Sequence, residues 1–358
     1  MKVLVTGVGD SGAVSRIVRQ ALHYRTFNNL EIVCLAIGDK NKEETIDNVK
    51  YITKRVNPFL SLFLKIKRKI FKAFKKNTFH IFWKNAFKQV LVVCNSFQPD
   101  LIIAASGHFY YMKASYEVAK RKGLKLELAF FDPFNGNALI PEIKKANQEA
   151  SKWCAYASRI LYDADGDIPL KTLDKNKVFP FLIPIFVSNE STKGEDLIYG
   201  GYFYEQFRPV SVLTDYINTF VDNAQRVNVY SDKKSCSLLM RDVEKTKSIT
   251  VHPMMSANCF DSICNNCLAI IVIGNANQYN TRPSKILEAI GHRKPIIILN
   301  FGQNLDYVKK YPFLFDANNE KSIESIKSVD QTTLMSYDVY SDFPDRHPNE
   351  FLNILFGN

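Results

Sequence analysis

Glycine, proline and long apolar runs are all scarce in this chain of 358 residues. Its 15 glycines and 14 prolines exclude collagen-like and low-complexity sequence. No charge-free apolar run approaches the roughly 18–20 residues of a membrane-spanning helix. The opening sequence, MKVLVTGVGD, lacks the regions of a signal peptide and predicts a β-strand instead. The 26 phenylalanines and 17 tyrosines exclude disorder as the main state, so we expect a globular protein of two domains.

Paired cysteines are also lacking, because the seven in the chain are an odd number scattered through apolar segments. This usage favours reduced thiols in a cytoplasmic protein over a disulfide framework. Cys264 and Cys267 form one CxxC, but a zinc site needs four ligands and no second pair accompanies it. We therefore expect both cysteines to lie on a helix that runs into the strand at Leu268, without a metal.

Acidic residues are absent between Asn48 and Pro99, a stretch that carries twelve basic residues. Because the formal net charge of the whole chain is +11, the remainder is close to neutral. A helix over Phe59–Lys76 would place Phe59, Phe63, Ile66, Ile70 and Phe74 on one face. The opposite arc would carry Lys65, Arg68, Lys69, Lys72, Lys75 and Lys76. A basic face opposite a phenylalanine-rich face is typical of a helix that lies in a membrane interface.

Three interpretations of this basic segment, residues 54–90, are open. Its apolar face either belongs to the domain core or docks on an anionic bilayer, or its charges follow nucleic-acid phosphates. We favour the bilayer and expect no nucleic-acid partner, because no nucleic-acid motif accompanies the charge.

Short apolar runs alternate with helical segments along most of the chain, which is typical of an α/β fold. The pattern predicts strands at Val3–Thr6, Glu31–Ile37, Asp100–Ala105, Leu126–Phe131, Arg159–Tyr162, Asp196–Tyr199, Arg226–Tyr230, Ile249–His252, Leu268–Ile273 and Pro295–Leu299. Two prolines predict irregular structure over Val178–Val187. We expect two doubly wound domains, 1–188 and 189–335, with a ligand between them and a tail, 336–358, that packs back on the first.

A glycine-rich loop, Gly7–Gly12, has the form GxGxxG between the first strand and the first helix. Taken alone, it suggests a dinucleotide site of an NAD(P)-dependent oxidoreductase or epimerase that uses Gly7, Gly9 and Gly12. That fingerprint requires an acidic residue about 20 residues after the loop, whereas Asp39 lies further away. The carboxylate of Asp10, inside the loop, would also repel a pyrophosphate. The alternatives are a tight turn, or one wall of an acceptor cleft formed by Gly9, Gly12 and Arg16.

The sequence Arg282-Pro283-Ser284-Lys285 opens a helix between two apolar strands. Pro283 suits a first helical position, where free N–H groups, the helix dipole and two cationic side chains favour an anion. Glu288 lies one turn later on the same side, where a carboxylate can accept both hydroxyls of a ribose. Phosphate and ribose together predict a site for a nucleoside diphosphate.

The segment after residue 282 resembles the donor-binding signature of GT-B fold glycosyltransferases, notably the family 4-like group of bacterial polysaccharide and glycan type. The matching residues are Pro283, Ser284, Lys285, Ile286, Leu287, Glu288, Gly291, Lys294 and Pro295. The resemblance implies two Rossmann-like domains that face each other across a cleft. It also implies a hexosyltransferase that moves sugar from a nucleotide-diphosphate donor to a glycan or lipid-linked acceptor. Such an enzyme would be cytoplasmic, and peripheral on the inner face of the membrane.

The resemblance also assigns donor-binding roles. Glu288 would hold the ribose, and Ser284, Lys285 and Arg208 the diphosphate. Asn275 to Asn280 would line the sugar pocket, and Gly200, Gly201 and Arg282 complete the donor site. Two departures affect these roles. Asn280 stands where the family commonly has glutamate, and Tyr202 stands where it has arginine. Arg208 lies one residue from the position of a family lysine, so it is either a displaced diphosphate ligand or a surface residue.

In GT-B enzymes the acceptor site is built from loops at the carboxyl ends of strands of the first domain, so the resemblance places the catalytic groups on those loops. Asp132 closes an apolar strand and His108 follows another, so either is a candidate general base for inverting transfer. Retaining enzymes of family 4 need no such base, and the stereochemical outcome stays open. We expect no cofactor and no essential metal, because arginine, lysine and the helix dipole can neutralise the leaving diphosphate. A non-catalytic protein that binds a glycan or a membrane is the remaining alternative.

Overall fold

The computed structural model describes residues 1–9, 12–27, 29–38, 40–55, 62–63, 66, 83–105, 109–131, 143–164, 174–204, 208–274, 284–300, 305–319 and 322–357. The chain divides into two compact units, of which the first comprises Met1–Ile183 and Pro348–Asn358 and the second Pro184–His347. The chain passes from the first unit to the second after Ile183, a few residues before the expected boundary at 188/189. It returns to the first unit at Pro348, within the expected tail, 336–358.

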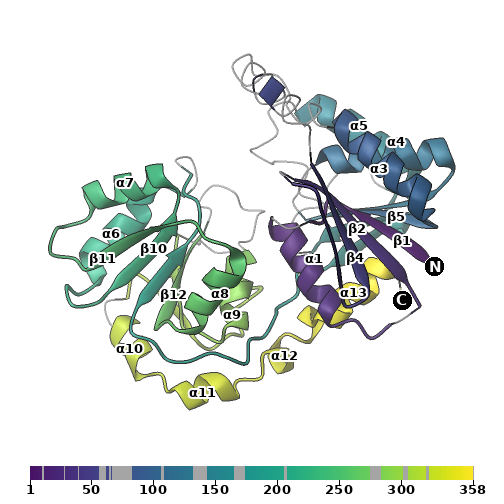
Figure 1. Ribbon diagram of the computed structural model, residues 1–358. Helices are drawn as coiled ribbons and strands as arrows, with labels where there is room; N and C mark the ends of the chain where they lie inside the picture. The colour runs from purple at the N-terminus through teal and green to yellow at the C-terminus, as the bar shows by residue number, and fades with distance from the viewer. Residues whose placement is uncertain are drawn as a thin grey trace. The chain divides into compact units, whose positions relative to one another are not determined.

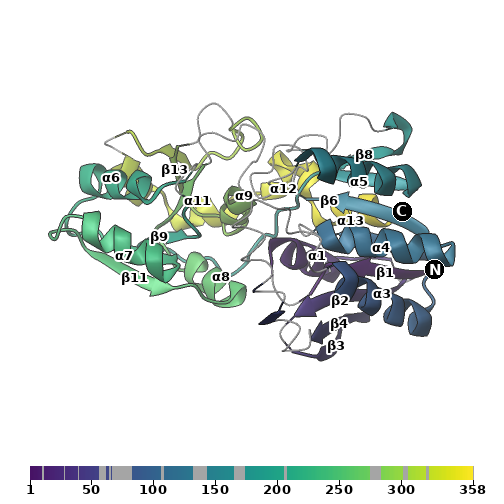
Figure 2. The ribbon, with the colours of Figure 1, turned by 90° about the horizontal axis from the view of Figure 1, so that it is seen from above.

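The first unit contains an eight-stranded sheet in the part of the chain that the structure describes. In spatial order its strands are β3 (Lys42–Ile46), β4 (Val49–Arg55), β2 (Glu31–Gly38), β1 (Lys2–Thr6), β5 (Leu101–Ala105), β6 (Lys125–Phe130), β7 (Arg159–Asp163) and β8 (Val178–Phe181). Figure 2 shows this order from β3 at one edge to β8 at the other. All neighbouring pairs are parallel except β3 and β4. The winding direction reverses between β1 and β5, and ligands of such sheets bind beyond the carboxyl ends of strands at that point.

Helices cover both faces of this sheet. They are α1 (Ala13–His23), α3 (Trp83–Phe97), α4 (Phe109–Lys122), α5 (Ile143–Tyr156), the short η2 (Lys175–Lys177) and α13 (Pro348–Phe356). Helices α3, α4 and α5 lie together on one face, and α1 and α13 lie on the other (Figure 1). The central strands β1 and β5 are buried along nearly their whole length, as their continuous apolar sequence requires in a parallel sheet covered on both faces.

The hairpin of β3 and β4 was not predicted from the sequence. Asp47 and Asn48 both adopt positive φ, 49° and 59°, and link strands whose register pairs Ile46 with Val49. This is the two-residue turn that matches the twist of an antiparallel pair. The first basic residues of the acid-free stretch, including Lys50 and Arg55, therefore lie in a strand.

Strand β8 was expected to be irregular because of its proline, and that expectation is wrong for Val178–Phe181. Proline lacks a backbone N–H, so it is tolerated in an edge strand whose outer side bonds to no neighbour. Pro180 sits opposite Tyr162 of β7 at the edge of the sheet, where this condition holds.

The second unit contains a six-stranded sheet among its described residues, parallel throughout. Its spatial order is β11 (Ile249–Pro253), β10 (Val227–Ser231), β9 (Leu197–Gly200), β12 (Ala269–Ile273), β13 (Ile296–Leu299) and β14 (Leu314–Asp316). Its helices are α6 (Val210–Phe220), α7 (Lys233–Asp242), α8 (Ala257–Asn265), α9 (Ser284–Gly291), α10 (Ser322–Ser328), α11 (Gln331–Ser336), α12 (Val339–Asp342) and η3 (Pro344–Arg346). The winding reverses between β9 and β12. Two doubly wound α/β units are thus confirmed.

Helix α13 comes from the end of the chain yet belongs to the first unit. Its apolar side, which includes Phe351 and Leu355, is buried. The Phe351 ring lies 5.5 Å from that of Phe181 and 6.1 Å from that of Phe131, centroid to centroid. Arg159 of β7 also donates a hydrogen bond to the carbonyl of Ile354. The last helix is therefore part of the core of the first unit.

We predict that Phe351→Ala lowers the free energy of unfolding of the first unit by about 3–5 kcal/mol, because it removes a buried aromatic side chain and leaves a cavity. Chemical denaturation followed by tryptophan fluorescence measures the change, since Trp153 is buried in that unit. Asn353→Ala, at an exposed position of the same helix, should change stability by less than about 0.5 kcal/mol. Equal stability of the two variants would contradict the packing role.

Candidate functional site

The amphipathic helix α9 carries the predicted donor residues on one side. Ser284, Lys285 and Glu288 are half-buried, whereas Ile286, Leu287, Ala289 and Ile290 between and after them are buried. The helix follows β12, on one side of the point where the winding reverses. The Lys285 ammonium donates a hydrogen bond to the carbonyl of Gly200, the last residue of β9 on the other side of that point. The structure thus joins two segments that lie 85 residues apart in the sequence.

The Gly200–Gly201 turn lies close to side chains from two helices. A Cβ on Gly200 would lie 2.1 Å from the Phe260 ring of α8, so glycine is required there for close packing. A Cβ on Gly201 would lie 2.8 Å from Lys285 Nζ and 3.3 Å from the Tyr199 hydroxyl. The backbone of the turn is therefore directly beside the Lys285 ammonium.

Arg208 approaches the same turn, and it is not a surface residue. It is only 9% exposed, and its backbone forms two hydrogen bonds with Tyr204, of 2.8 and 2.9 Å. Burial raises the pKa of Tyr199, and the nearby charge of Arg208 opposes part of that rise. The guanidinium therefore lies near the Tyr199 hydroxyl, which has no hydrogen-bond partner among the described residues, and near the position that Lys285 also approaches. Two of the predicted diphosphate ligands, Arg208 and Lys285, converge on one turn.

Tyr199 was not singled out from the sequence. It is 1% exposed, and in the sequence it is one more apolar position of a buried strand. Its only distinguishing signal is its place directly before Gly200. In the structure its hydroxyl stands beside both cationic side chains of the turn, so it belongs to the candidate site.

A cluster of three rings, Tyr230, His252 and Phe260, supports this turn from β10, β11 and α8, and it was not predicted from the sequence. The rings of Tyr230 and His252 stack at 4.5 Å, and Phe260 meets Tyr230 edge-on at 5.5 Å. The Gly201 N–H donates to the Tyr230 carbonyl at 3.0 Å, and the Ser231 hydroxyl donates to the Gly201 carbonyl at 2.7 Å. The carboxyl ends of β9, β10 and β11 are therefore held together as one rigid edge.

The described residues of the glycine loop, Gly7 to Gly9 and Gly12, are held by contacts within the first unit. Gly7 and Gly12 have positive φ, 89° and 99°. The Gly9 N–H donates to the Ser15 hydroxyl at 2.9 Å, and a Cβ on Gly9 would lie 2.4 Å from that of Ala36. Because the second glycine serves close packing and its N–H is already bonded, the geometry favours the tight-turn interpretation over a pyrophosphate site. Arg16 follows in the first turns of α1, half-buried.

Several predicted site residues lie outside the described residues, and their roles remain predictions. These are the candidate bases His108 and Asp132, the donor residues Asn275, Asn280 and Arg282, and the basic residues Lys65, Arg68, Lys69, Lys72, Lys75 and Lys76. Of the expected apolar face of the basic segment, the structure describes Phe63 and Ile66, which are 61% and 50% exposed.

Cys264 lies in α8 as expected, whereas Cys267 lies beyond the end of that helix, in the turn before β12, and both thiols are buried. Burial raises the pKa of Cys267 to about 12 and also raises that of Cys264, so both remain protonated and weakly nucleophilic at neutral pH. Across the described part of the chain, no three histidine, cysteine or acidic side chains are placed to hold a metal ion.

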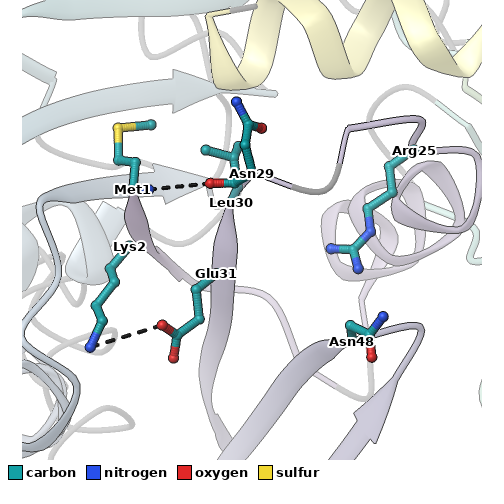
Figure 3. Close-up of a pocket in the computed structure, with 7 residues that line it drawn as sticks. All are labelled: Met1, Lys2, Arg25, Asn29, Leu30, Glu31 and Asn48. Atoms are coloured by element: carbon teal, nitrogen blue, oxygen red, sulfur yellow. Dashed lines mark hydrogen bonds and ion pairs between the residues drawn. The ribbon is translucent and has the colours of Figure 1, made fainter.

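An open surface pocket of about 680 Å³ lies at the amino ends of β1 and β2, at the edge opposite the glycine loop (Figure 3). Its lining residues are Met1, Lys2, Arg25, Asn29, Leu30, Glu31 and Asn48. Lys2 and Glu31 form an ion pair of 3.9 Å across it. Since ligands of doubly wound sheets bind at the carboxyl ends of strands, this pocket is separate from the candidate site.

We predict that Gly9→Ala destabilises the first unit by about 1–3 kcal/mol, because the new methyl group overlaps the Ala36 side chain. Removing the Ala36 methyl group in the double variant Gly9→Ala/Ala36→Gly should recover part of the lost stability. Thermal unfolding of wild type, both single variants and the double variant measures the coupling. Simple additivity of the two single changes would show that the contact does not explain this glycine.

No protein-family model matches the sequence, and no curated protein matches it significantly. Solved structures do share its fold along its whole length. The lipopolysaccharide outer core galactosyltransferase WaaB, in its apo form, is 14% identical with a TM-score of 0.56, and the alignment covers 100% of this chain and 99% of WaaB. Anabaena Alr3699/HepE in complex with UDP is 11% identical with a TM-score of 0.61 and the same coverage.

The UDP-GlcNAc 2-epimerase of Methanocaldococcus jannaschii is 10% identical, with a TM-score of 0.55 and full coverage of both chains. At these identities the likeness establishes the fold alone. The chain therefore has the α/β fold of the GT-B glycosyltransferases, built from two parallel-sheet units.

Proposed function

We propose that this protein is a glycosyltransferase that moves a sugar from a nucleoside-diphosphate donor to a glycan or lipid-linked acceptor. The observation that carries the proposal is the convergence of Arg208 and Lys285 on the Gly200–Gly201 turn, at the carboxyl edge of the second sheet. Cations beside a side-chain-free backbone turn are what the diphosphate of such a donor requires.

The remaining donor contacts follow from α9. Its first turn begins at Ser284 beside the same turn, so N–H groups at its start favour an anion there. Glu288 lies one helical turn beyond Lys285 on the same side, within the span between a diphosphate and its ribose. We assign the ribose hydroxyls to Glu288 and the diphosphate to Ser284, Lys285 and Arg208. The sugar would lie toward Asn275, Asn280 and Arg282.

Comparison with solved structures supports a uridine nucleotide as the first donor to test. HepE was solved with UDP, and the epimerase is named for a UDP-sugar. Because the GT-B fold serves both transfer and epimerisation in these neighbours, the reaction must be tested separately from binding.

The proposed transfer forms a bond from an acceptor hydroxyl to the anomeric carbon and breaks the bond from that carbon to the diphosphate. Inversion would need a base for the acceptor proton, and Asp132 and His108 are the candidates. The charge that develops on the leaving diphosphate is stabilised by Arg208, Lys285 and the start of α9. We therefore expect transfer to continue in EDTA, without a metal or another cofactor.

We predict that the protein binds at least one of UDP, GDP, CMP and ADP below millimolar concentration in calorimetry. Lys285→Met should raise Kd by roughly 10–100-fold, as expected for a lost charge-assisted hydrogen bond of about 1.5–3 kcal/mol. Glu288→Ala should also weaken binding, whereas Lys309→Met, at an exposed lysine of the same unit, should leave Kd unchanged.

Failure of all four nucleotides to bind, or unchanged Kd in both Lys285→Met and Glu288→Ala, would refute this donor site. Acceptor-dependent release of the nucleoside diphosphate distinguishes transfer from epimerisation and from a non-catalytic binding protein. Retention of NAD after purification would instead support an oxidoreductase that uses Gly7, Gly9 and Gly12.

We also propose that the basic segment, residues 54–90, docks the first unit on an anionic membrane surface. Support comes from the confinement of the positive charge to one acid-free stretch and from the exposure of Phe63 and Ile66. Among the described residues, no helix has the length and apolar character to cross a bilayer. Peripheral binding would bring a lipid-linked acceptor near the enzyme, and each lysine near the surface contributes about 1 kcal/mol.

We predict that the protein sediments with liposomes that contain anionic lipid, and that binding weakens steeply with salt because exposed charges are screened within ~10 Å at 0.1 M. Changing Lys65, Arg68, Lys69, Lys72, Lys75 and Lys76 to Gln should abolish sedimentation. A control with the same loss of charge changes six exposed lysines of the second unit, Lys233, Lys234, Lys245, Lys309, Lys310 and Lys327. If both six-fold variants sediment like wild type, the basic segment is not a membrane anchor.

A further inference from the structure

Lys294 is a buried lysine that the proposed chemistry does not use. It follows α9 and is 1% exposed, which is rare for a charged side chain. Its ammonium donates hydrogen bonds to the carbonyls of Thr192 and Cys267, the latter at 3.0 Å. Burial lowers the pKa of Lys294, and the neighbouring Cys267 and Cys264 oppose part of that fall. Burial raises the pKa of both thiols, so they stay protonated at neutral pH.

The hydrogen bonds of Lys294 tie three segments of the second unit together. Thr192 belongs to the stretch that enters this unit at Pro184, and Cys267 lies two residues before β12. The backbone N–H of Lys294 donates to Ala289 of α9 at 3.4 Å, and its carbonyl accepts from the Tyr311 hydroxyl at 2.9 Å. Lys294 therefore joins the carboxyl-terminal end of α9 to the amino end of β12 and to the entering stretch.

Two further contacts fix the same end of α9. The Ser188 N–H donates to the Gly291 carbonyl at 2.8 Å. A Cβ on Gly291 would lie 2.3 Å from the Phe186 carbonyl oxygen, so the helix meets the entering stretch at backbone distance. The opposite end of α9 carries Lys285, which reaches Gly200. The helix is thus held firmly at one end and presents its charged groups at the other.

A buried ammonium is an unfavourable way to fill this space. Desolvation of a charge costs several kcal/mol, and an apolar side chain of similar volume often stabilises a protein as well or better. What an apolar side chain cannot supply is directed bonds to two carbonyls of different segments. The hydrogen bonds of Lys294 therefore fix the positions of the segments around it, which packing alone would not do.

We propose that Lys294 is a positioning residue for diphosphate binding: it sets the angle of α9 so that Lys285, at the far end of the helix, meets the diphosphate, whereas Glu288 lies nearer the fixed end. The proposal rests on the donor site proposed above. An eight-residue helix is about 12 Å long, so a tilt of about 10° at its fixed end moves the other end by about 2 Å. A displacement of that order breaks a hydrogen bond, and the loss of one charge-assisted hydrogen bond weakens binding by roughly 10–100-fold.

The test compares Lys294→Met with Lys247→Met in calorimetry, with UDP, GDP and ADP and the matching nucleosides uridine, guanosine and adenosine as probes. Lys247 is a matched control, because its ammonium also donates to a backbone carbonyl of the second unit, that of Val221 at 2.6 Å, in a turn away from α9. For the diphosphate that wild type binds most tightly, Lys294→Met should raise Kd at least tenfold. Its nucleoside affinity should match that of wild type, and Lys247→Met should bind both probes like wild type.

Nucleoside affinity separates positioning from general damage, because a merely structural role would change both probes or neither. A folded Lys294→Met protein that binds the diphosphate like wild type overturns the proposal. If Lys294→Met does not fold, Gly291→Ala pushes the same end of α9 away from Phe186 without removing a buried charge, and it should give the same selective loss. Wild-type affinity in folded Gly291→Ala also overturns the proposal. If wild type binds none of the diphosphates, the donor site itself fails, and this inference fails with it.

Discussion

The turn at the end of β9 depends on the absence of side chains at two successive positions. Because Gly200 and Gly201 have no Cβ, the ring of Phe260 can lie against one and the ammonium of Lys285 beside the other. That close approach lets α9 contact β9 across the point where the sheet reverses its winding. It also leaves Arg208 and Tyr199 facing the same small region. The candidate donor site therefore depends on the space that these two glycines leave for their neighbours.

Much of the fold could be predicted, because buried parallel strands have continuous apolar sequence and each amphipathic helix has one apolar face. Strands such as β12 were found at nearly their observed bounds, and the start of α9 was predicted within one residue. The order of the strands, which brings β9 beside β12, was expected only in outline. It depends on long-range packing, which local periodicity does not encode.

The parts that escaped prediction have physical reasons. The strands of the Asp47–Asn48 hairpin contain too few apolar residues for a clear alternation, and β8 forms despite a proline because it is an edge strand. Tyr199 resembles any other buried strand residue until its neighbours in space are known. Lys294 appeared in the sequence as one residue of a motif, and only its burial and its two carbonyl partners give it a separate role.

The position of α13 has a consequence for protein synthesis. The second unit is one continuous stretch of chain, so all its residues are synthesised before residues 348–357. The first unit begins the chain, yet its core lacks Phe351 and the neighbouring aromatic contacts until residues 348–357 emerge. During translation, the unit that starts first is therefore completed last, and its unfilled apolar surface is exposed for most of that time. A nascent chain of this protein is expected to need chaperone protection at its amino-terminal unit rather than at the unit made later.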